Sequence, residues 1–150
     1  MIIYDEPRNI FEVAEQTLVN PVNTQGVMGA GLALAFRSTF PGLFEEYREA
    51  CQDEVFTRKG FFVFDVDASR KVLCLPTKRE WRHPSRLEWI EEGLWYLSRE
   101  YENYGITSLA IPEVGCGRGQ LSWAEVRPLI YQYLDPIALP VGICLSPYAV

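Results

Sequence analysis

Short apolar runs rich in strand-forming residues alternate along the chain with segments of helical periodicity. The apolar runs predict strands at residues 17–22, 60–66, 71–75, 108–114 and 141–146. Apolar positions recur at helical spacing between them, at residues 31–39, 43–52, 85–104 and 122–133. Alternating strands and helices predict an α/β fold whose mostly parallel sheet is buried on both faces.

Two of the predicted helices carry start signals. Ser85 with Glu88, and Ser122 with Glu125, have the spacing of a capping box, in which two side chains satisfy free backbone amides at a helix start. Gly105 is expected to end the helix that starts at Ser85. No internal repeat or linker divides the chain, so we expect one domain over residues 1–150.

Composition narrows the functional classes. The chain has 150 residues and a net charge of −6, which argues against non-specific binding to nucleic acid. Its four cysteines are widely spaced and His83 is its single histidine, so neither a metal site nor a disulfide framework is expected. The chain has no signal-peptide pattern and no apolar run long enough to cross a bilayer. We therefore expect a cytoplasmic protein with reduced thiols and no membrane partner.

Residues 19–33, VNPVNTQGVMGAGLA, follow the first predicted strand with a glycine-rich turn that we call the first glycine loop. Gly26, Gly29 and Gly31 let backbone amides approach an anion closely, and the helix that follows adds the positive end of its dipole. The order of the glycines matches neither the Rossmann fingerprint nor a P-loop. A plain strand-to-helix connection is the alternative, but it requires one glycine rather than three. The segment predicts a loop that binds a diphosphate.

A second glycine loop, residues 115–119, follows the strand predicted at 108–114. Ligands of parallel sheets bind at the carboxyl ends of strands, so both glycine loops and the corner at 76–78 should share one rim. Cys116 is interpreted as a packed thiol, because nothing in the sequence orients His83 beside it as a catalytic base.

A basic segment, residues 78–86 (KREWRHPSR), interrupts the acidic chain. Its positively charged residues are Lys78, Arg79, Arg82 and Arg86, against the single acid Glu80. Trp81 and His83 lie between them. This mixture is typical of a surface that holds nucleic acid by charge and stacking. A solvated loop whose charges pair with acidic helices is the alternative. The nucleic-acid interpretation gains weight if the segment lies beside the first glycine loop.

Three motifs, VNPVNTQGVMGAGLA, LPTKREWRHPSRLEWIEEGL and LAIPEVGCGRGQLSW, resemble the macrodomains, and most closely the branch of DarG antitoxins and terminal ADP-ribose protein glycohydrolases. The resemblance covers residues 9–133. It implies a three-layer α/β/α sandwich around a mixed, mostly parallel sheet that binds ADP-ribose at its carboxyl rim. DarG-like members remove ADP-ribose from thymidine in single-stranded DNA and so reverse a DarT-like toxin. The protein glycohydrolases instead cleave an ester to glutamate.

The resemblance also implies roles for individual residues. Those implied to bind ADP-ribose are Asn9, Ile10, Asn20, Asn23, Thr24, Gly26, Val27, Met28, Gly29, Gly31, Leu32, Thr77, Pro112, Gly115, Cys116, Gly117, Arg118 and Gly119. Those expected to contact DNA are Arg79, Trp81, Arg82 and His83. ADP-ribose is expected as ligand and product, with no cofactor and no metal. We expect a monomer whose partners are ADP-ribosylated single-stranded DNA and a DarT-like toxin.

Lys78 matches the catalytic lysine of the family. Its neutral amine is implied to attack the anomeric carbon of the distal ribose and to form a lysyl–sugar adduct that water resolves. Partial burial and the neighbouring Arg79 and Arg82 are expected to lower the pKa of Lys78 and so supply the neutral amine.

Two places depart from the family pattern. Arg8 and Asn9 replace a Gly-Asp pair whose carboxylate accepts from the adenine amino group, so a weaker, uncharged anchor is expected. Gly119 replaces the aspartate of the protein glycohydrolases, which favours DNA over glutamate esters as substrate. Glu80 and Glu113 remain candidates for proton transfer. A non-catalytic reader of ADP-ribose and a hydrolase of ADP-ribosylated protein stay open as alternatives.

Overall fold

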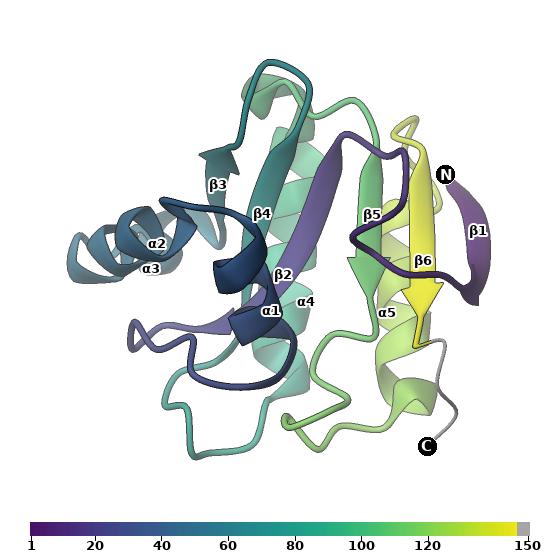
Figure 1. Cartoon of the computed structure of the whole chain (residues 1–150). Coiled ribbons are helices and arrows are strands. Elements are labelled where there is room, and N and C mark those ends of the chain that lie inside the picture. Colours follow the sequence, from purple (N-terminus) through teal and green to yellow (C-terminus); the bar gives the residue numbers. More distant parts are fainter. Residues whose placement is uncertain (147–150) are drawn as a thin grey trace.

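The computed structural model describes residues 1–146, so positions 147–150 of the predicted domain lie outside the described residues. In this part of the chain, the strands form one six-stranded sheet (Figure 1). The strands are β1 (Ile2–Pro7), β2 (Thr17–Asn23), β3 (Phe62–Asp65), β4 (Lys71–Lys78), β5 (Leu109–Pro112) and β6 (Val141–Leu145). Their order is β1-β6-β5-β2-β4-β3, and only the β3–β4 pair among them is antiparallel. The predicted mixed, mostly parallel sheet is confirmed.

Helices cover both faces of this sheet and complete three layers (Figure 1). They are α1 (Gly31–Thr39), α2 (Leu43–Gln52), α3 (Val55–Lys59), α4 (Leu87–Glu100), which a 3-10 helix (Tyr101–Tyr104) continues, and α5 (Trp123–Leu134). α1, α2 and α3 pack one apolar core against the sheet, and α4 and α5 pack a second core against its other face. The α/β/α sandwich implied by the resemblance is confirmed.

The path of the chain across the sheet reverses at β2. From β2 the chain passes to the edge strand β3 and back to β4 on one side, and from β4 it returns past β2 to β5 on the other. β2 and β5 pair only through Thr17 with Leu109 and Leu18 with Ala110, although β2 continues to Asn23. The two strands therefore part toward their carboxyl ends. Such a topological switch point is where α/β sheets bind ligands.

Several boundaries differ from the sequence prediction for physical reasons. β1 is absent from the prediction because it is an edge strand with most side chains exposed. α3 is also absent, since its five residues are too few to display a helical period. β4 continues through Lys78 instead of ending in a corner after residue 75. Pro76 is tolerated there because β3 pairs with β4 only as far as Cys74.

The capping box predicted at Ser85 is wrong. α4 has Arg86 as its N-cap residue, and no side chain caps it. The buried Ser85 hydroxyl instead donates to Thr77 Oγ1 at 3.2 Å, because the end of β4 lies against it. Ser122 does cap α5, accepting a backbone amide hydrogen bond at 3.2 Å. Gly105 ends the α4 segment in the left-handed conformation, with φ of +69°.

Candidate active site

One asparagine holds the first glycine loop from inside. Asn23 Oδ1 accepts hydrogen bonds from the backbone amides of Gln25, Gly26 and Val27 at 3.0, 3.1 and 3.3 Å. Its Nδ2 donates back to the Val27 carbonyl at 2.8 Å. The hydroxyl of the fully buried Tyr47 donates to the same asparagine. It lies 2.7 Å from the backbone carbonyl oxygen of Asn23 and 2.8 Å from its side-chain Oδ1. Asn23 thus fixes the shape of the loop.

The glycines of this loop differ in what requires them. Gly26 and Gly31 have φ of +96° and +59°, left-handed conformations that disfavour a side chain. Gly29 has no such requirement, and a Cβ atom there would meet Val27 Cγ1 at an ordinary 3.7 Å. Met28 beside it is buried in the core. A glycine with no conformational or packing reason leaves room for a ligand to approach the backbone.

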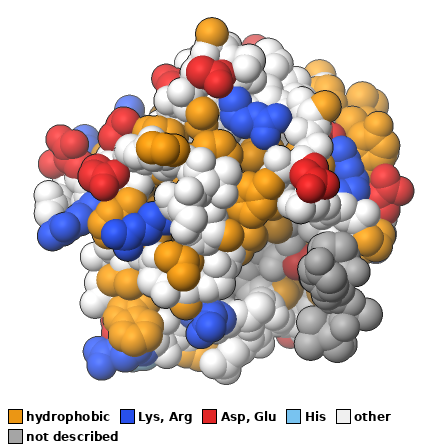
Figure 2. All heavy atoms as spheres, viewed as in Figure 1, with side chains coloured by type: hydrophobic (Ala, Val, Ile, Leu, Met, Phe, Trp, Pro, Cys, Tyr) orange, Lys and Arg blue, Asp and Glu red, His pale blue; other side chains and the backbone are white. Residues whose placement is uncertain are grey.

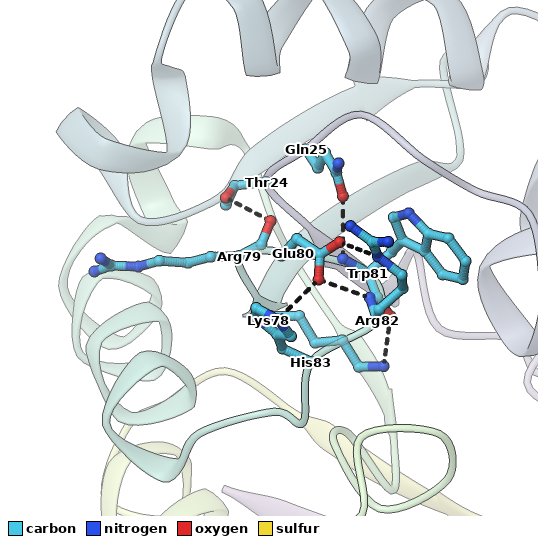
Figure 3. Close-up of polar contacts among 8 residues, drawn as sticks. All are labelled: Thr24, Gln25, Lys78, Arg79, Glu80, Trp81, Arg82 and His83. Atoms are coloured by element: carbon cyan, nitrogen blue, oxygen red, sulfur yellow. Dashed lines mark hydrogen bonds and ion pairs between the residues drawn. The ribbon is translucent and has the colours of Figure 1, made fainter.

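Lys78 is the last residue of β4 and lies directly beside the first glycine loop. It pairs with Asn23 in the β2–β4 register, and its carbonyl accepts from the Thr24 amide at 3.1 Å. Its Nζ donates to the carbonyl of Trp81 at 3.3 Å (Figure 3) and to the carbonyl of Arg118, in the second glycine loop, at 3.1 Å. The amine therefore stands where the two glycine loops meet.

The surroundings of Lys78 lower the pKa of its amine. Burial lowers the pKa of Lys78 and the positive charge of Arg118 lowers it further, whereas Glu80 opposes both. The predicted contribution of Arg79 and Arg82 is wrong. Arg82 Nε pairs with Glu80 Oε1 at 2.6 Å, and the Arg79 side chain is directed away from the amine (Figure 3). The cation that acts on the lysine comes from the second glycine loop.

The glycines of the second loop also divide into two kinds. Gly115 has φ of +76°, and core side chains would lie as close as 2.8 Å to a Cβ atom there. A Cβ atom on Gly119 would collide with Ser85 Oγ and with the carbonyl oxygen of Gly115. Gly117, in contrast, has open space around it, with no atom of residues 1–146 within 4 Å of a Cβ atom. Gly115 and Gly119 shape the loop, and Gly117 leaves its surface open.

The two glycine loops and the end of β4 form one rim, as predicted. The Ser85 amide donates to the Gly119 carbonyl at 2.9 Å, and the Ser85 hydroxyl joins this loop to Thr77 on β4. On the other side, a Cβ atom on Gly31 would lie 3.5 Å from both Cδ and Nε of Arg118. The loops therefore approach each other across the parted strands β2 and β5.

The face of the molecule above the parted strands is not uniformly basic. Figure 2 shows hydrophobic side chains between the α1 side and the β5–β6 side, with Lys and Arg side chains scattered around them. Simple phosphate neutralisation requires a continuous basic stripe. Anion binding at this rim would therefore rely on backbone amides of the loops rather than on a continuous basic surface.

Cys116 has the character of a packed thiol. Burial raises the pKa of Cys116 to about 11, and its Sγ donates to the Val114 carbonyl at 3.5 Å. A thiol with a raised pKa supplies little nucleophilic thiolate near neutral pH. His83 pairs with Glu80. Residues 1–146 contain no group of three or more acidic, cysteine or histidine side chains suited to a metal ion.

The basic segment brings three of its four predicted DNA contacts together. The Trp81 side chain is 50% exposed, and the Arg82 guanidinium lies 5.6 Å from its ring centroid. Arg82 and His83 both pair with Glu80 (Figure 3). The Arg79 side chain points in the opposite direction in the same view. Contact of these residues with DNA stays a prediction.

Three predicted ligand contacts away from the glycines lie at different depths. Asn9 is exposed, and its Oδ1, the predicted acceptor for adenine, already accepts from the Phe11 amide at 3.0 Å. Ile10 is buried in the core. Asn20 is fully buried, with Nδ2 3.9 Å from Cys74 Sγ, and its Oδ1 has no partner within the described part of the chain. Their contact with ADP-ribose stays a prediction.

Sequence reasoning missed three side chains that organise the rim. Tyr47 lies on an amphipathic helix, where an aromatic residue indicates core packing rather than a loop clamp. Ser85 has the spacing of a capping box, which concealed its bond to Thr77. Gln25 Oε1 accepts from the Trp81 amide at 3.1 Å and so ties the basic segment to the first glycine loop. Nothing in the sequence distinguished Gln25 from the polar residues Asn23 and Thr24 that precede it.

No helix within residues 1–146 combines the length and the apolar character needed to cross a membrane.

Known proteins are similar to this chain in both sequence and fold. The Macro domain family matches residues 19–130. The DNA ADP-ribosyl glycohydrolase of Thermus aquaticus is 39% identical in an alignment of 132 residues that covers 86% of this chain and 37% of that protein. The chain thus spans well under half the length of this curated relative.

Two solved structures match closely. The macrodomain of Thermus aquaticus DarG has a TM-score of 0.87 and 36% identity, over 96% of this chain and 97% of that one. Thermosipho africanus DarTG in complex with ADP-ribose has a TM-score of 0.87 and 33% identity, over 95% of this chain and 41% of that one. The family match extends from within β2 into α5 and so includes both glycine loops and Lys78. The chain belongs to the macrodomain family.

Proposed function

We propose that this chain is a DNA ADP-ribosyl glycohydrolase domain that removes ADP-ribose from modified thymidine in single-stranded DNA. The observation that carries the proposal is the position of the Lys78 amine, 3.1 Å from the Arg118 carbonyl, where the two glycine loops meet. A domain that only bound ADP-ribose would need the loops but no amine between them. The named activity of the Thermus aquaticus relative and the ADP-ribose complex of the Thermosipho relative support the proposal.

ADP-ribose would lie along the rim with its diphosphate between the two loops. The backbone at Gly29 and Gly117 is open to such a ligand, since none of the described residues crowds either position. Each amide that donates to a charged oxygen contributes about 1.5–3 kcal/mol, so a few of them hold a diphosphate without a lysine. Asn23 would act on the ligand through the loop that it shapes, because its carboxamide already binds the backbone.

The Lys78 amine would attack the anomeric carbon of the distal ribose. The bond from this carbon to the thymine nitrogen breaks as the bond to Nζ forms, and the released electron pair and a proton go to thymine. Water then hydrolyses the lysyl–sugar adduct, which releases ADP-ribose and restores the amine. The lowered pKa of Lys78 supports this role by increasing the neutral fraction of the amine. The scheme uses no cofactor.

Gly119 supports DNA rather than a glutamate ester as substrate. The aspartate of the protein glycohydrolases has no room here, since a Cβ atom would collide with Ser85 and with the Gly115 backbone. Hydrogen bonding from Arg82 lowers the pKa of Glu80, so this carboxylate stays ionised and is a poor proton donor. Thymine spreads the departing charge over its ring and needs less proton assistance than an alkyl amine.

We further propose a DarT-like toxin as the functional partner, whose DNA modification this domain would reverse. The DarTG relative from Thermosipho africanus supports a link to such a system. A cytoplasmic, monomeric domain fits this role and stays a prediction.

The test compares wild type, Lys78→Ala and Lys71→Ala on two substrates. Lys71 is the matched control, because it begins the same strand and pairs with Asp65 at 2.6 Å, far from the rim. Wild type and Lys71→Ala should release ADP-ribose from a thymidine-modified oligonucleotide, and Lys78→Ala should not, although all three remain folded by circular dichroism. Undiminished turnover by Lys78→Ala would end the nucleophile proposal.

The same assay separates the alternatives. Preferred turnover of glutamate-modified protein would establish a protein glycohydrolase. Binding of ADP-ribose with no turnover of either substrate would establish a reader.

A further inference from the structure

A cluster of two arginines on one tryptophan lies beside the site and has no part in the proposed chemistry. The Arg79 guanidinium lies 4.8 Å from the ring centroid of Trp89, and the Arg86 guanidinium lies 5.6 Å from the same centroid. Trp89 is in the first turn of α4. The Arg86 amide donates to the Thr77 carbonyl at 3.2 Å, which fixes the cluster to the residue before Lys78.

This cluster and the Trp81 surface extend in opposite directions from the backbone of the basic segment. Figure 3 shows the Arg79 side chain directed away from Trp81, Arg82 and His83. The Trp81 amide donates to the Gln25 side chain, which fixes the backbone of Trp81. Trp81 is 50% exposed, so its ring is available for a base to stack on. The cluster on Trp89 offers the two guanidinium groups of Arg79 and Arg86 instead. The two surfaces are therefore suited to different parts of a nucleic-acid strand.

The chemistry of the cluster matches a phosphate. A guanidinium that stacks on an indole ring keeps the N–H donors of its edge free, and its planar fork fits phosphate oxygens. Residues 78–89 carry four cations against Glu80 and Glu88, within a chain whose net charge is −6. Arg86 Nε is a loose 3.7 Å from Glu88, and both side chains are more than 60% exposed. Such an exposed pair is weak, so a phosphate can replace the carboxylate.

We propose that Arg79, Arg86 and Trp89 form a phosphate-binding subsite for the DNA strand that carries the modified thymidine. The strand passes over Lys78, with a flanking base on Trp81 and a flanking phosphate on this subsite. The inference rests on the proposed function, which brings a strand to Lys78. It adds that the strand is held in two directions, so turnover depends on nucleotides beyond the modified one.

The first test uses unmodified single-stranded DNA, whose binding is measured by fluorescence anisotropy across a series of salt concentrations. Arg86→Ala and the double variant Arg79→Ala/Arg86→Ala should lower the affinity about twofold to fivefold for each arginine removed. The plot of log affinity against log salt should become less steep by about 0.7 for each arginine. Arg99→Ala is the matched control, since Arg99 stacks on Trp95 at 4.6 Å near the other end of α4. It should bind as wild type does.

The second test separates charge from orientation. Trp89→Leu keeps both arginines but removes the ring that aligns them, so the affinity should fall while the salt dependence stays close to that of wild type. With modified substrates, Arg86→Ala should lower the ratio of kcat/KM on an oligonucleotide to kcat/KM on the ADP-ribosylated nucleoside.

The inference is overturned if Arg86→Ala and the double variant bind unmodified strands with the affinity and salt dependence of Arg99→Ala. A wild-type protein that hydrolysed no modified DNA would instead refute the proposed function. Binding of unmodified strands would still decide the subsite in that case.

Discussion

Replacement of Gly119 by alanine tests how the second glycine loop is shaped. The new Cβ atom would collide with Ser85 Oγ and the Gly115 carbonyl oxygen, and it would lie 2.9 Å from the Gly115 carbonyl carbon. Backbone atoms cannot rotate away, so the loop must shift and weaken the 2.9 Å bond from the Ser85 amide to the Gly119 carbonyl. Overpacking costs about 1–3 kcal/mol, and the stiffer unfolded chain returns about 0.4–1 kcal/mol. We expect the free energy of unfolding to fall by about 1–2 kcal/mol and the melting temperature by about 2–8 °C.

Gly117→Ala is the matched control two positions earlier. Its Cβ atom enters open space, and its backbone is outside the left-handed region, so the melting temperature should stay the same or rise slightly. The added methyl group nevertheless occupies the space in which we propose the diphosphate. The affinity for ADP-ribose should therefore fall about tenfold or more, as for the loss of one charge-assisted amide contact.

Thermal unfolding by circular dichroism and titration calorimetry with ADP-ribose distinguish the two variants. Gly119→Ala should have a lower melting temperature and also bind ADP-ribose more weakly, because the loop has moved. Gly117→Ala should keep its melting temperature and lose affinity alone. If Gly119→Ala has the same melting temperature as wild type, the packing argument for this loop is wrong. If Gly117→Ala binds as wild type does, Gly117 is not part of the ligand wall.

Three further outcomes follow from single contacts. Tyr47→Phe removes the hydroxyl that clamps Asn23 and should lower the free energy of unfolding by about 1 kcal/mol, measured by denaturant titration, and weaken ADP-ribose binding; unchanged values would mean that the asparagine holds the loop alone. Glu80→Gln removes the charge that raises the pKa of Lys78, so the ascending limb of kcat/KM against pH should move to lower pH, and a fixed limb would exclude this coupling. Because burial raises the pKa of Cys116 to about 11, its alkylation rate should keep rising with pH well above 9, whereas a plateau near 9 would indicate an ordinary exposed thiol.

The first glycine loop shows how far local signals reach. Its place after β2 and at the rim follows from an apolar run, a cluster of glycines and a helical period, all of which lie close together in the sequence. The use of the Asn23 carboxamide does not follow from them. Its partners are backbone groups that converge only once the loop is folded, and the hydroxyl of Tyr47, which is 24 residues away.

The surroundings of Lys78 show where neighbours in sequence mislead. Successive side chains at a strand end point to opposite sides, so Arg79 is directed away from the amine that precedes it. Arg82 is neutralised within its own turn by Glu80. The charge that does act on the lysine comes from Arg118, 40 residues away, across the parted strands. Only the sheet order, which the sequence pattern does not specify, brings the two together.

The same arginine opposes the effect that a bound ligand would have on the pKa of Lys78. The diphosphate of ADP-ribose carries negative charge, which raises the pKa of a nearby amine. Arg118 lies on the loop that would cover this diphosphate, and its positive charge lowers the pKa of Lys78. The ascending limb of kcat/KM reports the free enzyme and that of kcat reports the complex. Arg118 acts in both states, so in wild type the limb of kcat should lie at higher pH than that of kcat/KM by the effect of the diphosphate alone.

In Arg118→Ala both limbs should move to higher pH, since the amine loses a like charge in the free enzyme and in the complex. The Arg118 carbonyl, which accepts from Nζ, belongs to the backbone and remains in the variant, so a lost hydrogen bond does not explain the shift. Arg99→Ala, which removes an arginine far from the rim, is the control for net charge. Limbs that moved equally in Arg118→Ala and Arg99→Ala would mean that Lys78 responds to the charge of the whole domain, and that Arg118 has no special part in keeping the bound enzyme reactive.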